Sequence, residues 1–156
     1  YKLQIMTSFP NSFSQTDMDI VIARIKKLKV ESHPLWGKMS VAQMLKHCNV
    51  PYDTREMNIK PPFLLKWMIR LFFKQALINQ KPYAKNLQTA PHFLVEVNQN
   101  FENERVRLIN NINQTVKLGP AFFEGKNHYT LGVLTSQDWS NLLYKHLDHH
   151  LRQFGV

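Results

Sequence analysis

Three of the seven histidines in this chain lie within five residues of one another near the C-terminus, at His146, His149 and His150. Residues 139–154 have the apolar periodicity of a helix, and at about 100° per residue His146 and His150 lie on adjacent turns of one face. Trp139 and Gln153 project toward the same apolar, inward side. Two neutral imidazoles at positions i and i+4 can bind one metal ion from consecutive turns. The alternatives are a hydrogen-bonded core histidine and a cationic cluster that complements the helix C-terminus.

A third ligand must come from another helix, and His47 is the best candidate. Ser40 and Gln43 have the spacing of a capping box, which predicts that a helix begins there. His47 lies about 60° from the apolar stripe of this helix, at an edge that suits the rim of a cavity. Cys48 lies on the stripe itself, which favours a small packed hydrophobic residue over a catalytic thiol. The remaining candidates lie in predicted loops and are weaker: His33, His92 and His128.

Low glycine content, with five residues, and frequent helix formers predict an all-α fold. Helices are expected at about 15–29, from 40 to shortly after His47, at 63–79, at 98–118 and from 135 onward. Ser14 and Thr135 are the predicted N-caps of the first and last helices, Pro51 is expected to end or kink the second, and Gly119-Pro120 is expected to stop the fourth. With 156 residues, 44% of them hydrophobic, the chain is predicted to be one domain over 1–156, a four-helix bundle with long inter-helix connections.

The chain is strongly basic, with a formal net charge of +9. Such an excess permits attraction to nucleic acid, anionic lipid or acidic small molecules. The basic residues are spread along the chain without a nucleic-acid motif, so we expect no specific nucleic-acid binding. The single cysteine excludes an internal disulfide and fits a reducing cytoplasm. The opening residues lack the apolar run of a signal peptide, and because the chain starts at Tyr1 without a Met we expect a trimmed N-terminus or a longer natural protein.

The segment 63–79 is the most apolar stretch of the chain and is interrupted by Lys66, Arg70 and Lys74 at every fourth position. Charges at this spacing argue against a membrane span. We favour a helix that is buried on most of its circumference, partly by a second subunit, over an interfacial helix that lies on anionic lipid.

Residues 80–91 form a long connection without apolar periodicity, and such loops often form lids or pocket walls. Lys81, Tyr83 and Lys85 would give this wall a polar, cationic character. A solvated crossover is the alternative interpretation. The following residues, 92–97, are expected to form a short strand or the approach to a helix.

Two motifs carry a resemblance to a known superfamily. The first is Trp36-Gly-Lys-Met-Ser40-Val-Ala-Gln43-Met-Leu-Lys-His47-Cys, and the second is His146-Leu-Asp-His149-His150-Leu-Arg-Gln153-Phe. Together they resemble the DinB/YfiT-like superfamily, and in particular an uncharacterised bacterial branch of it. The likeness extends over nearly the whole chain and includes the Lys81-Pro-Tyr83 loop and the Leu-Arg-Gln-Phe-Gly ending.

The resemblance implies a usually dimeric bundle in which His47, His146 and His150 hold a divalent metal, with His149 outside the triad. It implies zinc or nickel as the metal, or iron or manganese, and better-understood relatives use the metal to activate a low-molecular-weight thiol. Hydrogen bonds to the ligands are expected from Gln43 and Gln153. The predicted pocket is completed by Trp139, His149 and Tyr83.

Three imidazoles leave coordination positions open, which is typical of a reactive rather than a structural metal site. An open position could hold water or a substrate thiolate. We therefore expect a cytoplasmic, metal-dependent thiol transferase or hydrolase that acts on a small molecule, with its protein general base unassigned. The alternative is a non-enzymatic binding module for an acidic ligand or an anionic membrane surface.

Overall fold

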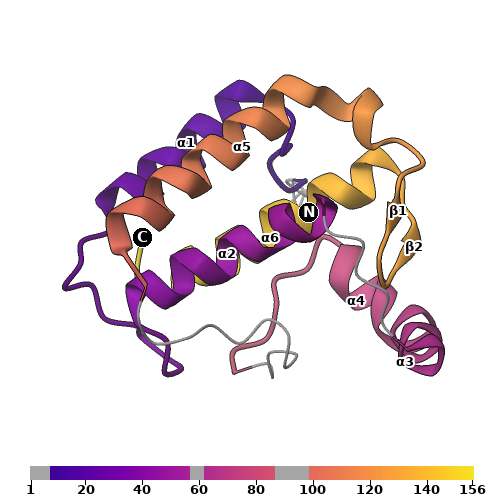
Figure 1. Cartoon of the computed structure of the whole chain (residues 1–156), viewed down its shortest axis with the longest axis horizontal. Helices are drawn as coiled ribbons and strands as arrows, with labels where there is room; N and C mark the ends of the chain where they lie inside the picture. The colour runs from indigo at the N-terminus through magenta and orange to yellow at the C-terminus, as the bar shows by residue number, and fades with distance from the viewer. Residues whose placement is uncertain (1–7, 57–61, 87–98) are drawn as a thin grey trace, which may run out of the picture.

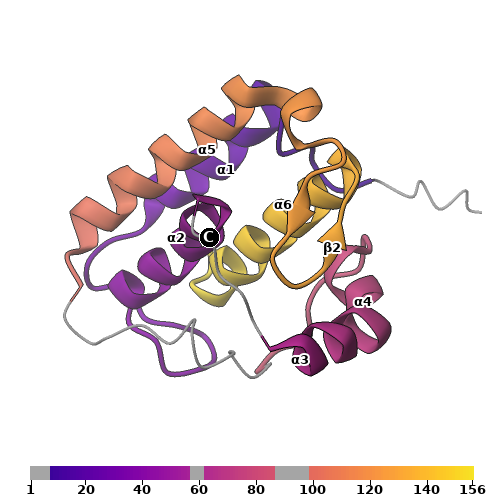
Figure 2. The same ribbon diagram turned by 45° about the vertical axis from the view of Figure 1, so that its right-hand side comes forward.

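The computed structural model describes residues 8–56, 62–86 and 99–156, and four long helices dominate it (Figure 1). These are α1 (Gln15–Lys27), α2 (Val41–Glu56), α5 (Phe101–Phe123) and α6 (Ser136–Gln153). Helices α1 and α5 lie side by side, and α2 and α6 pack beneath them (Figures 1 and 2). The all-α four-helix bundle expected from the sequence is thus confirmed.

The remaining elements are short. A continuous helical segment comprises α3 (Phe63–Met68), the π-helical turn η1 (Ile69–Phe73) and α4 (Lys74–Ile78). An antiparallel hairpin pairs β1 (Asn127–His128) with β2 (Gly132–Val133) ahead of α6. The strand considered for residues 92–97 lies outside the described residues.

The predicted helix starts are confirmed by their hydrogen bonds. The Ser14 side chain accepts from the Asp17 N–H at 3.3 Å and caps α1. Ser40 and Gln43 form the expected capping box, with reciprocal hydrogen bonds of 2.9 and 3.2 Å. At α6, a box between Thr135 and Asp138 uses two 3.1 Å bonds. These caps satisfy backbone N–H groups that a helix leaves unpaired at its N-terminus.

Of the two helix interruptions predicted, an end at Pro51 is absent and the break at Gly119 is present. Helix α2 does not end at Pro51 but continues to Glu56. Its later turn is anchored by the buried Tyr52 and by an ion pair between Asp53 and Arg107 of α5, so tertiary packing offsets the hydrogen bond that proline cannot donate. At Gly119 the helical geometry is interrupted, as predicted, by φ 71° and ψ 172°, but a further helical turn follows to Phe123.

The main core lies between the four long helices. Its members recur every three or four residues along each helix, so each helix turns one apolar stripe inward. Cys48 belongs to this core at 1% exposure, as the sequence predicted. A second cluster beside the hairpin joins α6 to the end of α4, and consists of Ile78, Phe123, Leu131, Leu134 and Trp139.

The segment α3–η1 is attached to the rest of the chain on one side only. Ile69 packs against the second cluster, Arg70 donates a hydrogen bond to the carbonyl of Thr130, and Lys74, the first residue of α4, donates to that of Val133. Figure 2 shows the segment beside the hairpin. The opposite side is exposed, with Phe63 at 82% and Phe72 at 67%. The described residues therefore do not bury this helix on most of its circumference, and its burial by a second subunit stays a prediction. Within the described ranges, no helix has the length and apolar character needed to cross a membrane.

Candidate metal centre

Helix α6 presents His146 and His150 on adjacent turns, and α2 presents His47 opposite them. Their ligand nitrogens all lie within 4.8 Å of one another. The Nε2 atoms of His47 and His146 are 3.0 Å apart, and the His47 ring centroid lies 4.7 Å from that of His150. The structure thus brings together the three histidines that the sequence singled out.

The separation between His47 and His146 fits a shared ion. Two nitrogens that bind one ion at about 2.05 Å lie about 2.9 Å apart at a right angle and about 3.3 Å apart at the tetrahedral angle. The separation of 3.0 Å between His47 and His146 falls in this interval. It also fits a direct hydrogen bond between two neutral rings, one donating and one accepting. A metal ion and a histidine–histidine hydrogen bond are therefore the two states that the cluster can adopt.

His146 and His150 are held in the neutral form that a metal requires. Burial, and secondarily the neighbouring His150 and His47, hold the pKa of His146 well below its usual range. Burial, with His47 as the next cause, lowers the pKa of His150 to about 3. A neutral imidazole has a free nitrogen lone pair, so a divalent ion would displace no proton from these two rings at neutral pH.

Gln153 determines which nitrogen of His150 is free. Its Nε2 donates to the Trp36 carbonyl at 2.7 Å, so its Oε1 must face the other way. That Oε1 lies 2.8 Å from His150 Nδ1, which must then donate its proton. The Nε2 of His150 is left as the lone-pair nitrogen for a metal. Partners of this kind orient metal-binding histidines and select their tautomer.

The loop that precedes α2 supports this arrangement, a role that the sequence interpretation missed. The Leu35 N–H donates to the Gln153 carbonyl at 2.7 Å, so the loop binds both the backbone and the side chain of this residue. Gly37 has φ +80°, and a Cβ atom there would lie 2.6 Å from Gln153 Nε2. The Trp36-Gly37 pair is present in the sequence motif, but its contact with α6 depends on a loop path that spacing does not reveal.

The other predicted site residues lie in three places. His149 and Tyr83 make an edge-on ring contact beside the cluster, with centroids 5.8 Å apart. Trp139 packs with Phe123 in the second hydrophobic cluster, near the hairpin. Gln43 uses its Oε1 to close the α2 N-terminus, and its predicted contact with His47 stays a prediction.

Cys48 and His128 are two further residues that the sequence analysis considered. Burial raises the pKa of the Cys48 thiol, and its Sγ lies 3.6 Å from Met44 Sδ, so it is a packed core residue. His128 lies on β1, where its Nδ1 accepts from the N–H groups of Thr130 and Leu131 at 3.2 Å. His128 therefore stabilises the hairpin turn and lies outside the cluster, while His92 lies outside the described residues.

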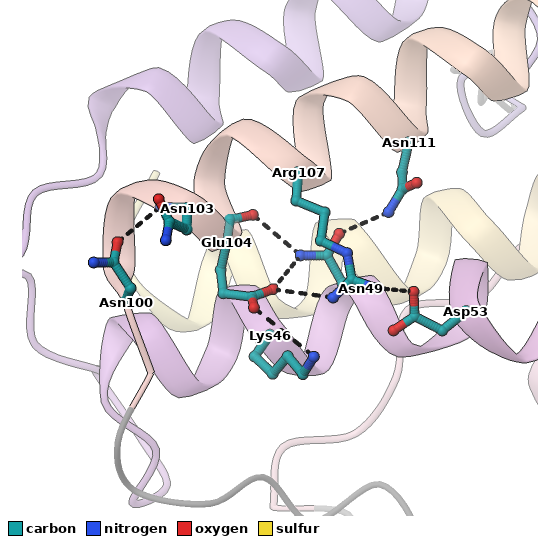
Figure 3. Close-up of polar contacts among 8 residues, drawn as sticks. All are labelled: Lys46, Asn49, Asp53, Asn100, Asn103, Glu104, Arg107 and Asn111. Carbon is teal, nitrogen blue, oxygen red and sulfur yellow. Dashed lines mark hydrogen bonds and ion pairs between the residues drawn. The ribbon is translucent and has the colours of Figure 1, made fainter.

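A polar network keeps α2 in place on α5 (Figure 3). Asn49 is fully buried at 0% exposure, and its Nδ2 donates to the Glu104 carboxylate at 2.8 Å and to the Glu104 carbonyl at 3.1 Å. Its Oδ1 accepts from Asn111 at 2.9 Å. Arg107 joins the network by pairing with Asp53. Since Asn49 is two residues from His47, this network fixes the rotation of α2 that directs His47 toward α6.

The fold and the cluster define a class: an all-α bundle with three histidines from two helices gathered at one point. The family model described as "Protein of unknown function (DUF1569)" matches residues 8–155. The chain therefore belongs to this family. No curated protein and no solved structure matches the chain.

Proposed function

We propose that this protein binds one divalent metal ion through His47, His146 and His150 and uses it in a reaction on a small molecule. The observation that carries the proposal is the gathering of the three ligand nitrogens within 4.8 Å, with burial lowering the pKa of two of the rings, His146 and His150. Three imidazoles suit zinc or nickel, and iron or manganese are alternatives that the ligand type admits. The sequence motifs further support assigning the family to the DinB/YfiT-like superfamily.

The proposed activity is that of a thiol transferase or hydrolase. A divalent ion at such a site lowers the pKa of a bound thiol or water and thereby supplies a nucleophile at neutral pH. The residues of the chain hold and orient the metal ligands. Gln153 directs one His150 nitrogen toward the centre, and the Asn49 network fixes α2. We place the protein in the cytoplasm, where low-molecular-weight thiols are kept reduced.

The test is the metal content of untagged protein purified without chelators, compared with the His146→Ala and His33→Ala variants. We expect about one ion per chain in the parent protein, because three imidazoles with an open position form a complete site. His146→Ala should lose the metal. His33 is exposed and lies outside the cluster, so His33→Ala should keep it.

Circular dichroism of each variant would show whether the helices are retained. Metal that persists in a folded His146→Ala protein would contradict the ligand assignment. Absence of metal in the parent protein, even after incubation with zinc, nickel, iron or manganese, would leave the cluster as a histidine–histidine hydrogen bond between α2 and α6.

A further inference from the structure

A small pocket lies beside the histidine cluster on the adjacent face of α6. Residues at i, i+3, i+4 and i+7 lie on one face of a helix, and here they are Lys145, Asp148, His149 and Arg152. The facing wall comes from two loops and consists of Trp36, Pro82, Tyr83 and Lys85. The cavity has a volume of about 130 Å³. It is therefore close in size to the cavity of about 150 Å³ that accepts benzene in an engineered protein.

Aromatic rings frame this pocket. His149 meets Trp36 edge-on at 5.9 Å and Tyr83 edge-on at 5.8 Å between ring centroids. Lys85 lies over the Trp36 ring and Lys145 over the Tyr83 ring, with Nζ 4.6 and 4.5 Å from the ring centroids, so the pocket combines aromatic and cationic groups. The indole N–H of Trp36 is buried without a hydrogen-bond acceptor among the described residues. An unpaired buried donor is costly, so a ligand oxygen that reached it would relieve that cost.

The charges around the pocket favour an anion. Lys85 places its Nζ 4.6 Å from the centroid of the Trp36 ring, and Arg152 is exposed at the rim with its side chain at 57%. Lys145 is already engaged, since its Nζ donates to the carbonyl of Ala76 at 2.6 Å and to the side chain of Asn79 at 2.8 Å. Lys85 and Arg152 are thus the two cations that a ligand could meet.

The single carboxylate of the lining does not cancel them. Asp148 accepts from Arg24 at 2.8 Å, so its charge is paired with a cation outside the pocket lining. Its other oxygen lies 3.8 Å from Arg152, a separation that leaves the guanidinium free to bind a closer partner. The lining therefore has a net positive charge with an aromatic wall.

We propose that this pocket binds a small carboxylate with a planar, apolar body, with the ring against His149 and Tyr83 and the carboxylate toward Arg152 and Lys85. The inference rests on the proposed function insofar as the ligand is the substrate. The connection is His149, whose ring centroid lies 5.0 Å from that of His150. A ligand in the pocket thus lies one ring away from the candidate metal centre.

The test is calorimetric titration of metal-free and zinc-loaded protein with benzoate. We expect saturable binding that weakens about tenfold in Arg152→Gln and in Lys85→Gln, because each removes a charge-assisted hydrogen bond. Lys117→Gln removes the same charge from an exposed site on α5 and should bind benzoate like the parent. Benzamide, which has the same shape without the charge, should bind at least about tenfold more weakly.

Three results would overturn the inference: no saturable benzoate binding, equal binding of benzamide, or equal weakening by Lys117→Gln. Inorganic phosphate that bound more tightly than benzoate would also overturn it, since the aromatic wall would then contribute nothing. The two proposals fail separately. His146→Ala should keep benzoate binding while it loses metal. A parent protein that binds metal but no benzoate would support the metal site and contradict the carboxylate pocket.

Discussion

A single residue, Gln153, joins the loop before α2 to the histidine cluster. Its amide is orientated by the Trp36 carbonyl, and that orientation determines the His150 tautomer. The helix spacing predicts that Gln153 shares a face with His146 and His150. Spacing does not predict its acceptor, because Trp36 lies 117 residues earlier in the chain. Such a long-range contact is set by folding and is invisible to local periodicity.

Substitution of Gln153 should weaken metal binding without removing a ligand. In Gln153→Leu, His150 Nδ1 loses its acceptor, and we expect zinc affinity to fall by about 10- to 100-fold in competition with a chromophoric chelator. Gln153→Glu keeps an acceptor for His150 and should retain affinity, although it cannot donate to Trp36. Gln137→Leu, at an exposed position on α6, is the matched control. Equal affinity in the Leu and Glu variants would show that the tautomer of His150 is set by other contacts.

His128 should make folding stability depend on pH. Burial lowers the pKa of its ring to about 4, below the ordinary value of 6.5. Between these values the unfolded chain binds a proton that the folded chain does not, so stability decreases as the pH falls from 6.5 toward 4. Protonation at Nδ1 would also break the hydrogen bonds from Thr130 and Leu131.

The measurement is the melting temperature between about pH 7 and pH 4 for the parent, His128→Asn and His33→Asn. Asn can accept the same turn hydrogen bonds but does not titrate, so His128→Asn should lose less stability on acidification. His33 is exposed, and its replacement should leave the parent pH profile unchanged. Parallel profiles for all three proteins would exclude His128 as a source of the acid sensitivity.

At the scale of helices, the contact between α2 and α5 depends on a buried amide. Asn49→Ala would remove the hydrogen bonds from Asn49 to Glu104 and from Asn111 to Asn49, and we expect a loss of about 1–3 kcal/mol in the free energy of unfolding, measured in urea. Asn113→Ala, at an exposed position on α5, is the control and should change stability little. A loss in Asn49→Ala no larger than in the control would mean that the network in Figure 3 contributes no stability.

Helix starts were predictable because capping is local: Ser14, the Ser40–Gln43 pair and the Thr135–Asp138 pair each act over three residues. The extension of α2 beyond Pro51 was not predictable, because the contacts that stabilise it come from α5. The three-histidine cluster was suggested by the sequence because the apolar stripe of each of the two helices indicates which face turns inward. The pocket beside it required the positions of two loops, which carry no periodic signal.

At the scale of the whole molecule, the outer face of α3–η1 is a large apolar surface that residues 8–56, 62–86 and 99–156 leave uncovered. Its exposed members are Phe63, Leu64, Trp67, Leu71, Phe72 and Phe73. Contiguous patches of this kind mark interaction surfaces in proteins. Arg70 of this segment and Lys74 at the start of α4 donate to hairpin carbonyls, so they are not presented beside this face as lipid-binding helices require. A second copy of the chain is therefore the occupant that we expect.

Sedimentation velocity should accordingly detect a dimer that Phe72→Asp converts to a monomer. Phe72 is 67% exposed, so the substitution places a charge on the outer face without disturbing the core. Ile20→Asp is the matched control, because Ile20 is 62% exposed on α1, and this variant should remain dimeric. A monomeric parent, or a dimeric Phe72→Asp protein, would contradict the expectation. If the parent is monomeric and sediments with phosphatidylserine vesicles while Phe72→Asp does not, the face binds an anionic membrane surface instead.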